Sequence, residues 1–347
     1  MTKTERAKAN KEKKIQKTKD YNLKLKKETN QLVVDRMISQ LEAGVDVWRR
    51  DWGGAHGGMP YNFAEGYQFS GDNVFMLMMF GGGGFATVKQ VKKKYGNHFG
   101  PSKGSQGIHV QKPYIIPWKN KDGSPKLDKD GKPEGVLKGF GWFKVFKLEQ
   151  FINYNTGKSL AEEKNLGVKK IVTSNHNRYK GTMSELLTTS YINNEKINIG
   201  IGDPSYSPSA DKICMPTYDD WNGTDSEKIA SMGSTLHHEC YHSTAPRVGR
   251  KLGYTKTKYA LEELSAELCA SFLNCQTGID SKELEKRSAS YLQGWADKLK
   301  GETVDNIMKC VGDAVTGQAY ILKASDFVQD KDTKEWYYPE TEERKVA

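Results

Sequence analysis

His238-Glu239-Cys240-Tyr241-His242 is the most informative stretch of this 347-residue sequence. Side chains four residues apart lie on one face of a helix, so the imidazoles of His238 and His242 can converge on a single metal ion. Glu239 lies between them, where a carboxylate can act as general base toward a water molecule. The HExxH pattern therefore predicts a hydrolytic zinc site. The competing interpretation is a surface helix that carries two unrelated histidines.

A zinc site of this kind needs a third protein ligand and leaves the fourth position open. Residues 259–273 are predicted to form a buried amphipathic helix with Glu263 and Glu267 four apart on one face. One carboxylate can bind zinc while the other accepts a hydrogen bond from a ligand imidazole. We predict Glu263 as the third ligand and Glu267 as the supporting acceptor, whereas Glu262 is expected to belong to a solvated acidic stripe. The residues together favour a zincin-type, gluzincin-like peptidase site with one Zn²⁺ per chain.

The segment before the motif agrees with this interpretation. Residues 225–244 are predicted to form one helix, capped by Thr224 or Asp225, with Pro246 just beyond its end. Upstream, residues 206–216 are typical of a short strand closed by a proline. Such a strand could hold an extended peptide at a sheet edge or could be a core strand, and both interpretations stay open.

Length and composition indicate two domains with cores of ordinary size. We expect no membrane partner, because no apolar run approaches the roughly eighteen residues of a membrane span. The N-terminus has no apolar signal core, so export is not expected. The five cysteines are an odd number without paired spacing, which is typical of small buried residues in a reducing cytoplasm. The predicted location is therefore the cytoplasm of a host cell.

Charge is distributed unevenly along the chain. Residues 1–27 hold eleven basic and three acidic side chains, and residues 29–160 hold eighteen and eleven. Residues 161–347 hold twenty-four basic and twenty-eight acidic side chains. A basic half beside a mildly acidic half suggests that the first half meets a polyanion. The lysine-rich segment 2–27 is expected to be disordered or a solvated helix, either as a DNA-contacting arm or as a solubility tail.

The basic half also contains candidate DNA-binding residues. Residues 28–43 are predicted to form a helix with Leu32, Val33, Met37, Ile38 and Leu41 on its apolar face, and Gly44 ends it. Arginines bracketed by tryptophans can pair with phosphates while the indoles stack on unpaired bases, although tryptophan is also a common core residue. The predicted single-stranded-DNA contacts are Trp48, Arg49, Arg50, Trp52, Lys89, Gln90, Lys93 and Lys103.

The remaining pattern completes the predicted layout. We expect a short helix within 85–95, strands at 108–110 and 142–146, a surface hairpin or insertion at 119–135, and helices at 288–299 and 303–322. The fold class is α+β, with a basic α+β domain that binds single-stranded DNA and a mainly helical zincin-like domain with a small sheet. The expected boundaries are a tail at 1–28, domains at 29–155 and 181–328, a linker at 156–180 and a charged tail at 329–347.

The ordered series of these motifs resembles the ArdC-type antirestriction proteins of plasmids and phages. Its carriers are Trp48-Arg49-Arg50 with Trp52; Gly71 and Asn73; Thr87 and Gln90; Lys103-Gly104; Tyr206-Ser207-Pro208; the His238 to His242 motif; Arg247 and Arg250; and Tyr259 with Glu262 to Glu267. The resemblance covers roughly residues 29–325. It implies an N-terminal single-stranded-DNA-binding domain, a C-terminal zincin-like metallopeptidase domain, and protection of incoming DNA from restriction.

The chain departs from the family pattern at four positions. Val47 and Asp51 replace the prolines that usually precede the two tryptophans, and Asp51 weakens the expectation that every residue of that turn contacts DNA. Cys240 follows the motif glutamate in place of the usual Leu or Ile, and Ser243 follows the second histidine in place of the usual Trp, but the three predicted ligands are intact.

Three functional hypotheses follow. The first is a zinc metallopeptidase tethered to single-stranded DNA that acts on DNA-associated proteins. The second is a protein that coats single-stranded DNA and uses zinc only for structure. The third is a phage-packaged protein whose lysine-rich segment contacts DNA.

Overall fold

The computed structural model describes residues 3–47, 59–127, 134–166, 182–252, 256–279, 284 and 289–339. The chain divides into two compact units, unit 1 with residues 1–33 and 85–165 and unit 2 with residues 34–84 and 166–347. The architecture is α+β with small sheets, which confirms the predicted fold class. The unit boundaries differ from the expected domain boundaries, because residues 34–84 group with the C-terminal part of the chain rather than with the basic domain.

The first helix, α1 (Lys3–Glu42), includes most of the lysine-rich segment, which corresponds to the helical alternative of the sequence analysis. Its buried apolar side chains are Leu25, Val33, Val34, Met37 and Leu41. Leu32 was expected on this face, but it is 51% exposed because its neighbours Val33 and Val34 occupy the buried side. Gly44 follows the helix with a φ of 73°, a conformation that favours glycine and ends the helix as expected.

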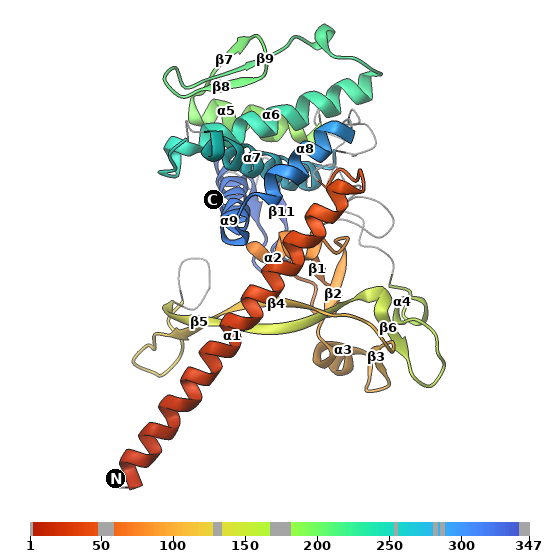
Figure 1. Ribbon diagram of the computed structural model, residues 1–347, viewed down its shortest axis with the longest axis vertical. Helices are drawn as coiled ribbons and strands as arrows, with labels where there is room; N and C mark the ends of the chain where they lie inside the picture. Colours follow the sequence, from red (N-terminus) through yellow and green to blue (C-terminus); the bar gives the residue numbers. More distant parts are fainter. Residues whose placement is uncertain are drawn as a thin grey trace. The chain divides into compact units, whose positions relative to one another are not determined.

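Unit 1 is built on a long antiparallel hairpin. Strands β4 (Ile108–Pro117) and β5 (Gly135–Lys147) pair from Ile108 and Val145 at one end to Pro117 and Gly135 at the other (Figure 1). Both strands are longer than the sequence analysis predicted. β5 also pairs with β2 (Gly84–Ala86). The unit further contains α3 (Val88–Tyr95), β3 (Phe99–Pro101), β6 (Phe151–Asn153) and α4 (Leu160–Glu163).

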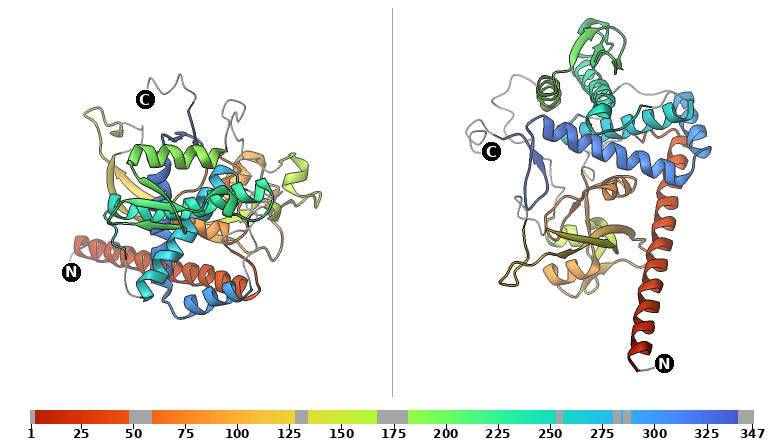
Figure 2. Two further views of the ribbon diagram at one scale, coloured as in Figure 1. Left: turned by 90° about the horizontal axis from the view of Figure 1, so that it is seen from above. Right: turned by 90° about the vertical axis from the view of Figure 1, so that its left-hand side faces the viewer.

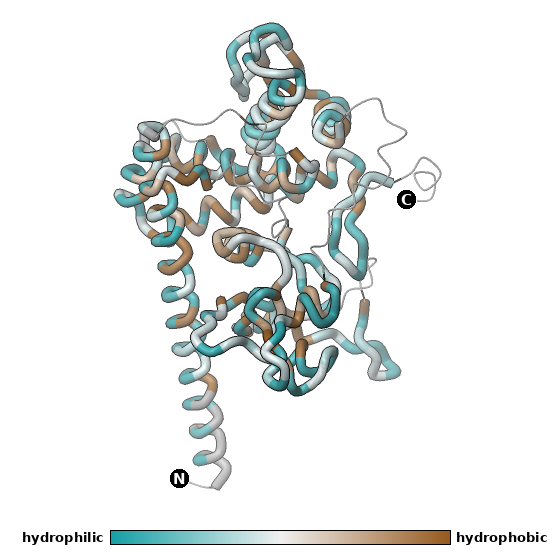
Figure 3. The backbone as a smooth tube through the Cα atoms, turned by 90° about the vertical axis from the view of Figure 1, so that its right-hand side faces the viewer, coloured by the Kyte–Doolittle hydropathy of each residue, from teal (hydrophilic) through white to brown (hydrophobic). Residues whose placement is uncertain are grey.

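Unit 2 has a helical core in which α7 packs against both α6 and α9. Helices α2 and α5 pack against α9 as well. Hydrophobic residues recur along these helices (Figure 3). The fully buried side chains include Phe75, Tyr191, Tyr241, Leu264, Phe272, Ile307, Val311 and Ile321. The helices are α2 (Asp72–Met78), α5 (Met183–Glu195), α6 (Asp225–Arg247), α7 (Lys256–Thr277), α8 (Ala289–Lys300) and α9 (Val304–Ala324).

A three-stranded sheet lies against α6 (Figures 1 and 2). The strand order is β7 (Asn198–Ile201), β9 (Lys212–Met215) and β8 (Ser205–Ser207). β9 is parallel to β7 and antiparallel to β8. The single strand predicted within 206–216 is therefore two strands, because the chain reverses between them. Asp211 precedes β9 with a φ of 42°.

One short strand and one strand pair complete the unit. β1 (Tyr61–Asn62) lies near the start of the described stretch 59–84. β10 (Val328–Gln329) pairs antiparallel with β11 (Trp336–Tyr337), so part of the segment expected as a charged tail forms a hairpin. Gln276 of α7 donates a hydrogen bond to the Trp336 carbonyl, which fastens this hairpin to the core. Within the described ranges, no helix is long and apolar enough to cross a membrane.

Helix α6 begins where the sequence analysis placed it. The Thr224 hydroxyl accepts a hydrogen bond from the Glu227 amide, and the Glu227 carboxylate accepts one from the Thr224 amide. This reciprocal cap satisfies amides that the first helical turn leaves unpaired. The helix continues past its expected end at Thr244 to Arg247, so Pro246 lies inside its last turn and donates no amide hydrogen bond to the His242 carbonyl. The HExxH residues consequently lie within a helix whose start is fixed by the Thr224 cap.

Candidate metal centre

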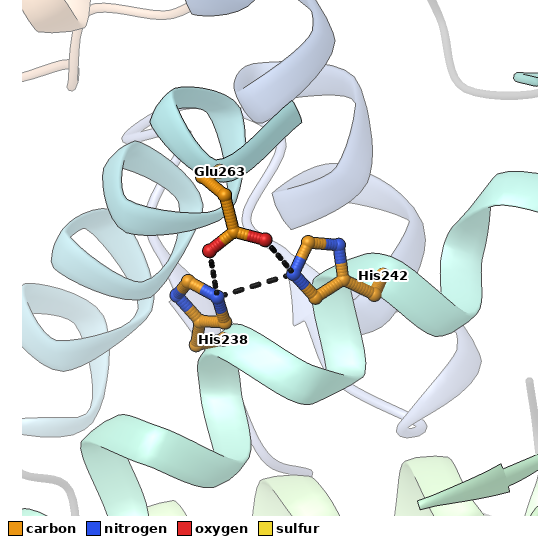
Figure 4. Close-up of side chains that lie close together, drawn as sticks. All are labelled: His238, His242 and Glu263. Atoms are coloured by element: carbon orange, nitrogen blue, oxygen red, sulfur yellow. Dashed lines mark hydrogen bonds and ion pairs between the residues drawn. The ribbon is translucent and has the colours of Figure 1, made fainter. Parts of the chain in front are cut away.

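The predicted ligands converge from two packed helices (Figure 4). His238 and His242 lie one turn apart on α6, and Glu263 reaches them from α7. The two imidazole Nε2 atoms are 3.1 Å apart. Glu263 brings one carboxylate oxygen within 3.3 Å of the His238 Nε2 and the other within 3.4 Å of the His242 Nε2. Two nitrogens and a carboxylate therefore face a common point.

These spacings fit a small divalent cation. Ligand atoms about 2.0–2.2 Å from a tetrahedral ion lie roughly 3.3–3.5 Å from one another. The three observed separations of 3.1, 3.3 and 3.4 Å are close to that value. The side chains retain 16%, 12% and 23% of their exposure, so the cluster is sheltered yet reachable from solvent. The donor set suits zinc or a similar transition metal and leaves one position for water or substrate.

Glu262 supports His242 from behind. Its carboxylate oxygen lies 3.0 Å from the His242 Nδ1, so the nitrogen that faces away from the cluster donates to it. Arg250 pairs with the same carboxylate and also donates to the Tyr241 carbonyl at 3.0 Å. The expectation that Glu262 belongs to a solvated stripe was wrong, because its side chain is only 10% exposed. Glu262 and Glu263 are adjacent, so the sequence alone does not show which carboxylate faces the cluster and which one pairs with His242.

Glu267 lies behind the other imidazole at a greater distance. Its carboxylate oxygen is 3.9 Å from the His238 Nδ1, which is within ion-pair range but longer than a hydrogen bond. Tyr291 of α8 donates a hydrogen bond of 3.2 Å to the same oxygen. Each histidine thus has a carboxylate near its outer nitrogen, and the hydrogen bond to Glu262 fixes the orientation of the His242 ring.

The charges of the cluster stabilise one another. Burial works to raise the pKa of the Glu263 carboxyl, but hydrogen bonds from His238 and His242 outweigh it and hold that pKa far below its usual range. Burial works to lower the pKa of His242, but hydrogen bonds to Glu262 and Glu263 raise it to about 9. Burial raises the pKa of Glu239, opposed by the neighbouring imidazoles. Glu239 is 6% exposed and electrostatically coupled to all three predicted ligands.

A buried polar chain lies directly behind the site and was missed by the sequence analysis. Asn274 donates to the Ser234 hydroxyl at 2.8 Å, so its oxygen accepts from the His237 Nδ1 at 2.7 Å. The His237 Nε2 then accepts from the Ser184 hydroxyl at 3.1 Å. Burial lowers the pKa of His237 to about 4, so the ring is neutral. The chain ties α5, α6 and α7 together beside the predicted ligands.

The predicted DNA contacts fall into two groups. Lys89 and Lys93 lie one turn apart on the exposed face of α3, and Lys103 is exposed in the turn after β3. The Gln90 oxygen accepts from the Thr87 amide and caps α3, a structural role that the capping pattern could have revealed. Trp48, Arg49, Arg50 and Trp52 lie outside the described residues.

Two protein families match the chain. Residues 186–310 match the model of a zincin-like metallopeptidase, and this range contains the whole cluster. Residues 27–146 match the N-terminal domain of the anti-restriction factor ArdC. Unit 2 therefore carries a zincin-like metallopeptidase domain. With both matches in this order, the chain matches the ArdC-type family, which confirms the resemblance seen in the sequence.

Individual proteins are also similar to the chain over most of its length. Two Escherichia coli proteins named DNA primase TraC are 27% and 26% identical to the chain over 317 residues, which cover 88% and 86% of it. The chain spans only 20% and 27% of their lengths. The metal-free and Mn(II)-bound crystal structures of the antirestriction protein ArdC from plasmid R388 share its fold, with TM-scores of 0.56 and 0.57 at 24% and 23% identity. Each match covers 85% of this chain and 97% of the ArdC chain.

Proposed function

We propose that this chain is an antirestriction protein that binds single-stranded DNA and cleaves DNA-associated proteins at a metal-dependent peptidase site. The observation that carries the proposal is the set of 3.1–3.4 Å separations among the His238, His242 and Glu263 ligand atoms. Two imidazoles and a carboxylate this close to one another suit a shared cation, and a further carboxylate lies near the outer nitrogen of each imidazole. The Mn(II)-bound relative supports a divalent metal, and zinc is the ion that the donor set favours.

His238, His242 and Glu263 would hold the cation, which supplies Lewis acidity when bound. Glu239 would take a proton from the water that attacks the peptide carbonyl and deliver it to the leaving amine. Its raised pKa suits this exchange, because a general base works best when its pKa lies near the working pH. Glu262 and Arg250 would hold the His242 ring in its orientation, and Glu267 would do the same less tightly for His238.

DNA binding would belong to the N-terminal region that matches the ArdC domain. Residues 1–27 and 29–160 both carry more basic than acidic side chains, as a phosphate-binding surface requires. Binding to single-stranded DNA would raise the local concentration of the peptidase near proteins on the same strand. The proposed place of action is the cytoplasm, where incoming DNA meets host proteins.

The test separates metal binding, peptide cleavage and the biological effect. Metal content is measured for the wild type and for the His238→Ala variant, with His98→Ala as a matched control at an exposed histidine of unit 1. The expected result is one divalent ion per chain in the wild type and the control, and loss in His238→Ala. Glu239→Ala should keep the metal and lose both peptide cleavage and protection from restriction. Protection that persists in Glu239→Ala would remove proteolysis from the function.

A further inference from the structure

The distal part of the β4–β5 hairpin leaves the core of unit 1 while remaining apolar. At the root of the hairpin Ile108, Val110 and Val145 are buried, with at most 7% exposure. Farther out, large apolar side chains are 40–63% exposed on both strands: Tyr114, Ile115, Ile116, Val136, Leu137, Phe140 and Phe143. A two-stranded ribbon gains little stability alone, and exposed apolar strands invite association. These side chains therefore need an explanation other than core packing.

One face of the ribbon has a definite composition. Tyr114 pairs with Gly139, Lys112 with Gly141 and Val110 with Phe143, so these six residues share a face. It is continuous with the buried face at the root of the hairpin. It carries two aromatic rings, that of Phe143 on β5 near the root and that of Tyr114 on β4 farther out, and Lys112 of β4 lies at the level between them. We call these three residues with Gly139 and Gly141 the aromatic platform.

The two glycines leave the floor of the platform open. A Cβ added at Gly139 would meet no atom within 4 Å, so the space above it is free. A Cβ added at Gly141 would lie 3.3 Å from the Phe143 ring, which shows that this ring leans over the glycine. Directly opposite Tyr114 there is therefore no side chain, and its ring, 63% exposed, can be covered by a planar group.

The charge around the platform is positive. Residues 108–147 contain nine lysines and four acidic residues. Of the two acidic residues described there, Glu134 pairs with Lys126 at 2.5 Å and Asp122 accepts from Ser124. Lys112, Lys138 and Lys144 are all exposed along the paired strands. An aromatic surface edged by lysines matches single-stranded nucleic acid, because the rings can stack on unpaired bases while the lysines pair with phosphates. The lysines do not suit a membrane interior, and the rings have no partner in an acidic peptide that lacks aromatic groups.

We infer that the aromatic platform binds single-stranded DNA, with bases stacked on Tyr114 and Phe143 and phosphates paired with Lys112 and its neighbouring lysines. The inference rests on the proposed DNA binding and names a place for it. It adds a surface to the contacts predicted on α3 and in the turn at Lys103. Aromatic stacking needs unpaired bases, so the platform explains a preference for single strands that lysines alone do not provide.

The primary experiment measures binding of the full chain to a fluorescent thirty-nucleotide oligo-dT by anisotropy. Tyr114→Ala with Phe143→Ala should weaken binding at least tenfold, whereas Tyr114→Phe should stay within about twofold of the wild type. Gly141→Thr, which fills the floor without removing a ring, should also weaken binding. Ile199→Ala, at an exposed apolar strand residue of unit 2, is the matched control and should leave affinity unchanged. Binding to duplex DNA should change little in any of these variants.

Several outcomes would overturn the inference. If the wild type does not bind oligo-dT, the proposed DNA binding fails and the platform fails with it. If the wild type binds and the platform variants bind equally well, while Lys89→Ala with Lys93→Ala weakens binding, the platform alone is refuted. If the double variant instead turns a sedimenting dimer into a monomer with unchanged DNA affinity, the face is an interface between copies of this chain.

A second measurement covers the case in which the variants do not fold. The wild-type chain is cross-linked by light to oligonucleotides containing 5-iododeoxyuridine, and the attached peptides are identified by mass spectrometry. Cross-links at Tyr114 or Phe143 support the platform. Cross-links confined to α3 or to residues 48–52 contradict it.

Discussion

At the residue scale, the site depends on carboxylates that do not themselves face the cluster. Glu262 and Glu267 approach the outer nitrogens of His242 and His238, but at 3.0 and 3.9 Å respectively. Only the first distance is a hydrogen bond, and Arg250 fixes the carboxylate that makes it. The two histidines are therefore held with different rigidity, so the effects of Glu262 and Glu267 on metal binding can be compared within one site.

The first prediction uses this difference. Glu262→Gln should weaken zinc affinity about 10–100-fold, because the imidazole loses a charged partner that orients it. Glu267→Gln is the matched variant and should have a smaller effect, since its oxygen lies farther from the ring. Competition with a chromophoric chelator measures both affinities. Equal losses in the two variants would contradict the assigned roles.

The second prediction concerns protons. In the metal-free protein the pKa of His242 is about 9, so at pH 7 the imidazole carries a proton that a metal ion must displace. Metal binding at pH 7 should release about one proton from this residue, and affinity should rise roughly tenfold per pH unit up to about pH 9. Titration calorimetry in two buffers of different ionisation enthalpy counts the protons. An affinity that is constant between pH 7 and 9 would refute the prediction.

At the element scale, Arg247 joins the end of α6 to the end of α5 and to the turn before β9. Its guanidinium donates to both Asp211 oxygens at 3.0 and 2.7 Å and to the Glu195 carboxylate at 2.7 Å. Asp211 precedes β9, and it also accepts from Tyr206 of β8 at 2.8 Å. Glu195 ends α5 and accepts from Tyr320 of α9. The three-stranded sheet is thereby held against the helix that carries the histidines.

The third prediction follows from this geometry. Arg247→Lys should destabilise unit 2 by about 1.5–3 kcal/mol, because an ammonium group cannot reproduce the planar fork that spans two carboxylates. The destabilisation should appear first in the three-stranded sheet, so the variant should accelerate hydrogen exchange more in β8 and β9 than in α7. Urea unfolding and exchange measured by mass spectrometry test the two parts. Uniformly faster exchange across unit 2 would show that the residue stabilises the core and not the sheet.

Sequence reasoning succeeded where a local pattern sets the element. The Thr224 cap, the start of α6 and the helix bearing Glu263 follow from nearby residues, and HExxH spacing follows from helical periodicity. Glu262 could not be assigned, because the choice between adjacent carboxylates depends on how α7 is rotated against α6. The length of β4 was underestimated from the sequence. A surface strand is recognised by polar residues on one face and apolar residues on the other, and residues 111–117 have apolar side chains on both faces.

At the scale of the whole molecule, sequence order and structural grouping differ. Residues 34–84 precede most of unit 1 in the sequence yet belong to unit 2, where α2 packs against α9. The α2 side chains from Val74 to Met78 are at most 3% exposed. Burial of such side chains contributes roughly 1.5–3 kcal/mol each. The contact between α2, in the first third of the sequence, and α9, near its end, therefore stabilises the unit that carries the metal cluster.

The fourth prediction is that cutting the chain after residue 165 destabilises unit 2, whose residues lie on both sides of the cut. A fragment of residues 1–165 exposes the apolar face of α2, and a fragment of residues 166–347 loses the cover of α9. The fragment of residues 1–165 should retain unit 1 but bind a hydrophobic dye through the exposed face of α2, and the fragment of residues 166–347 should lack a cooperative thermal transition. Co-expressed fragments should copurify and recover the transition, because α2 can return to α9. Independent folding of residues 166–347 would contradict the prediction, because it would show that α2 is dispensable. DNA binding by residues 1–165 would then belong to an intact DNA-binding domain.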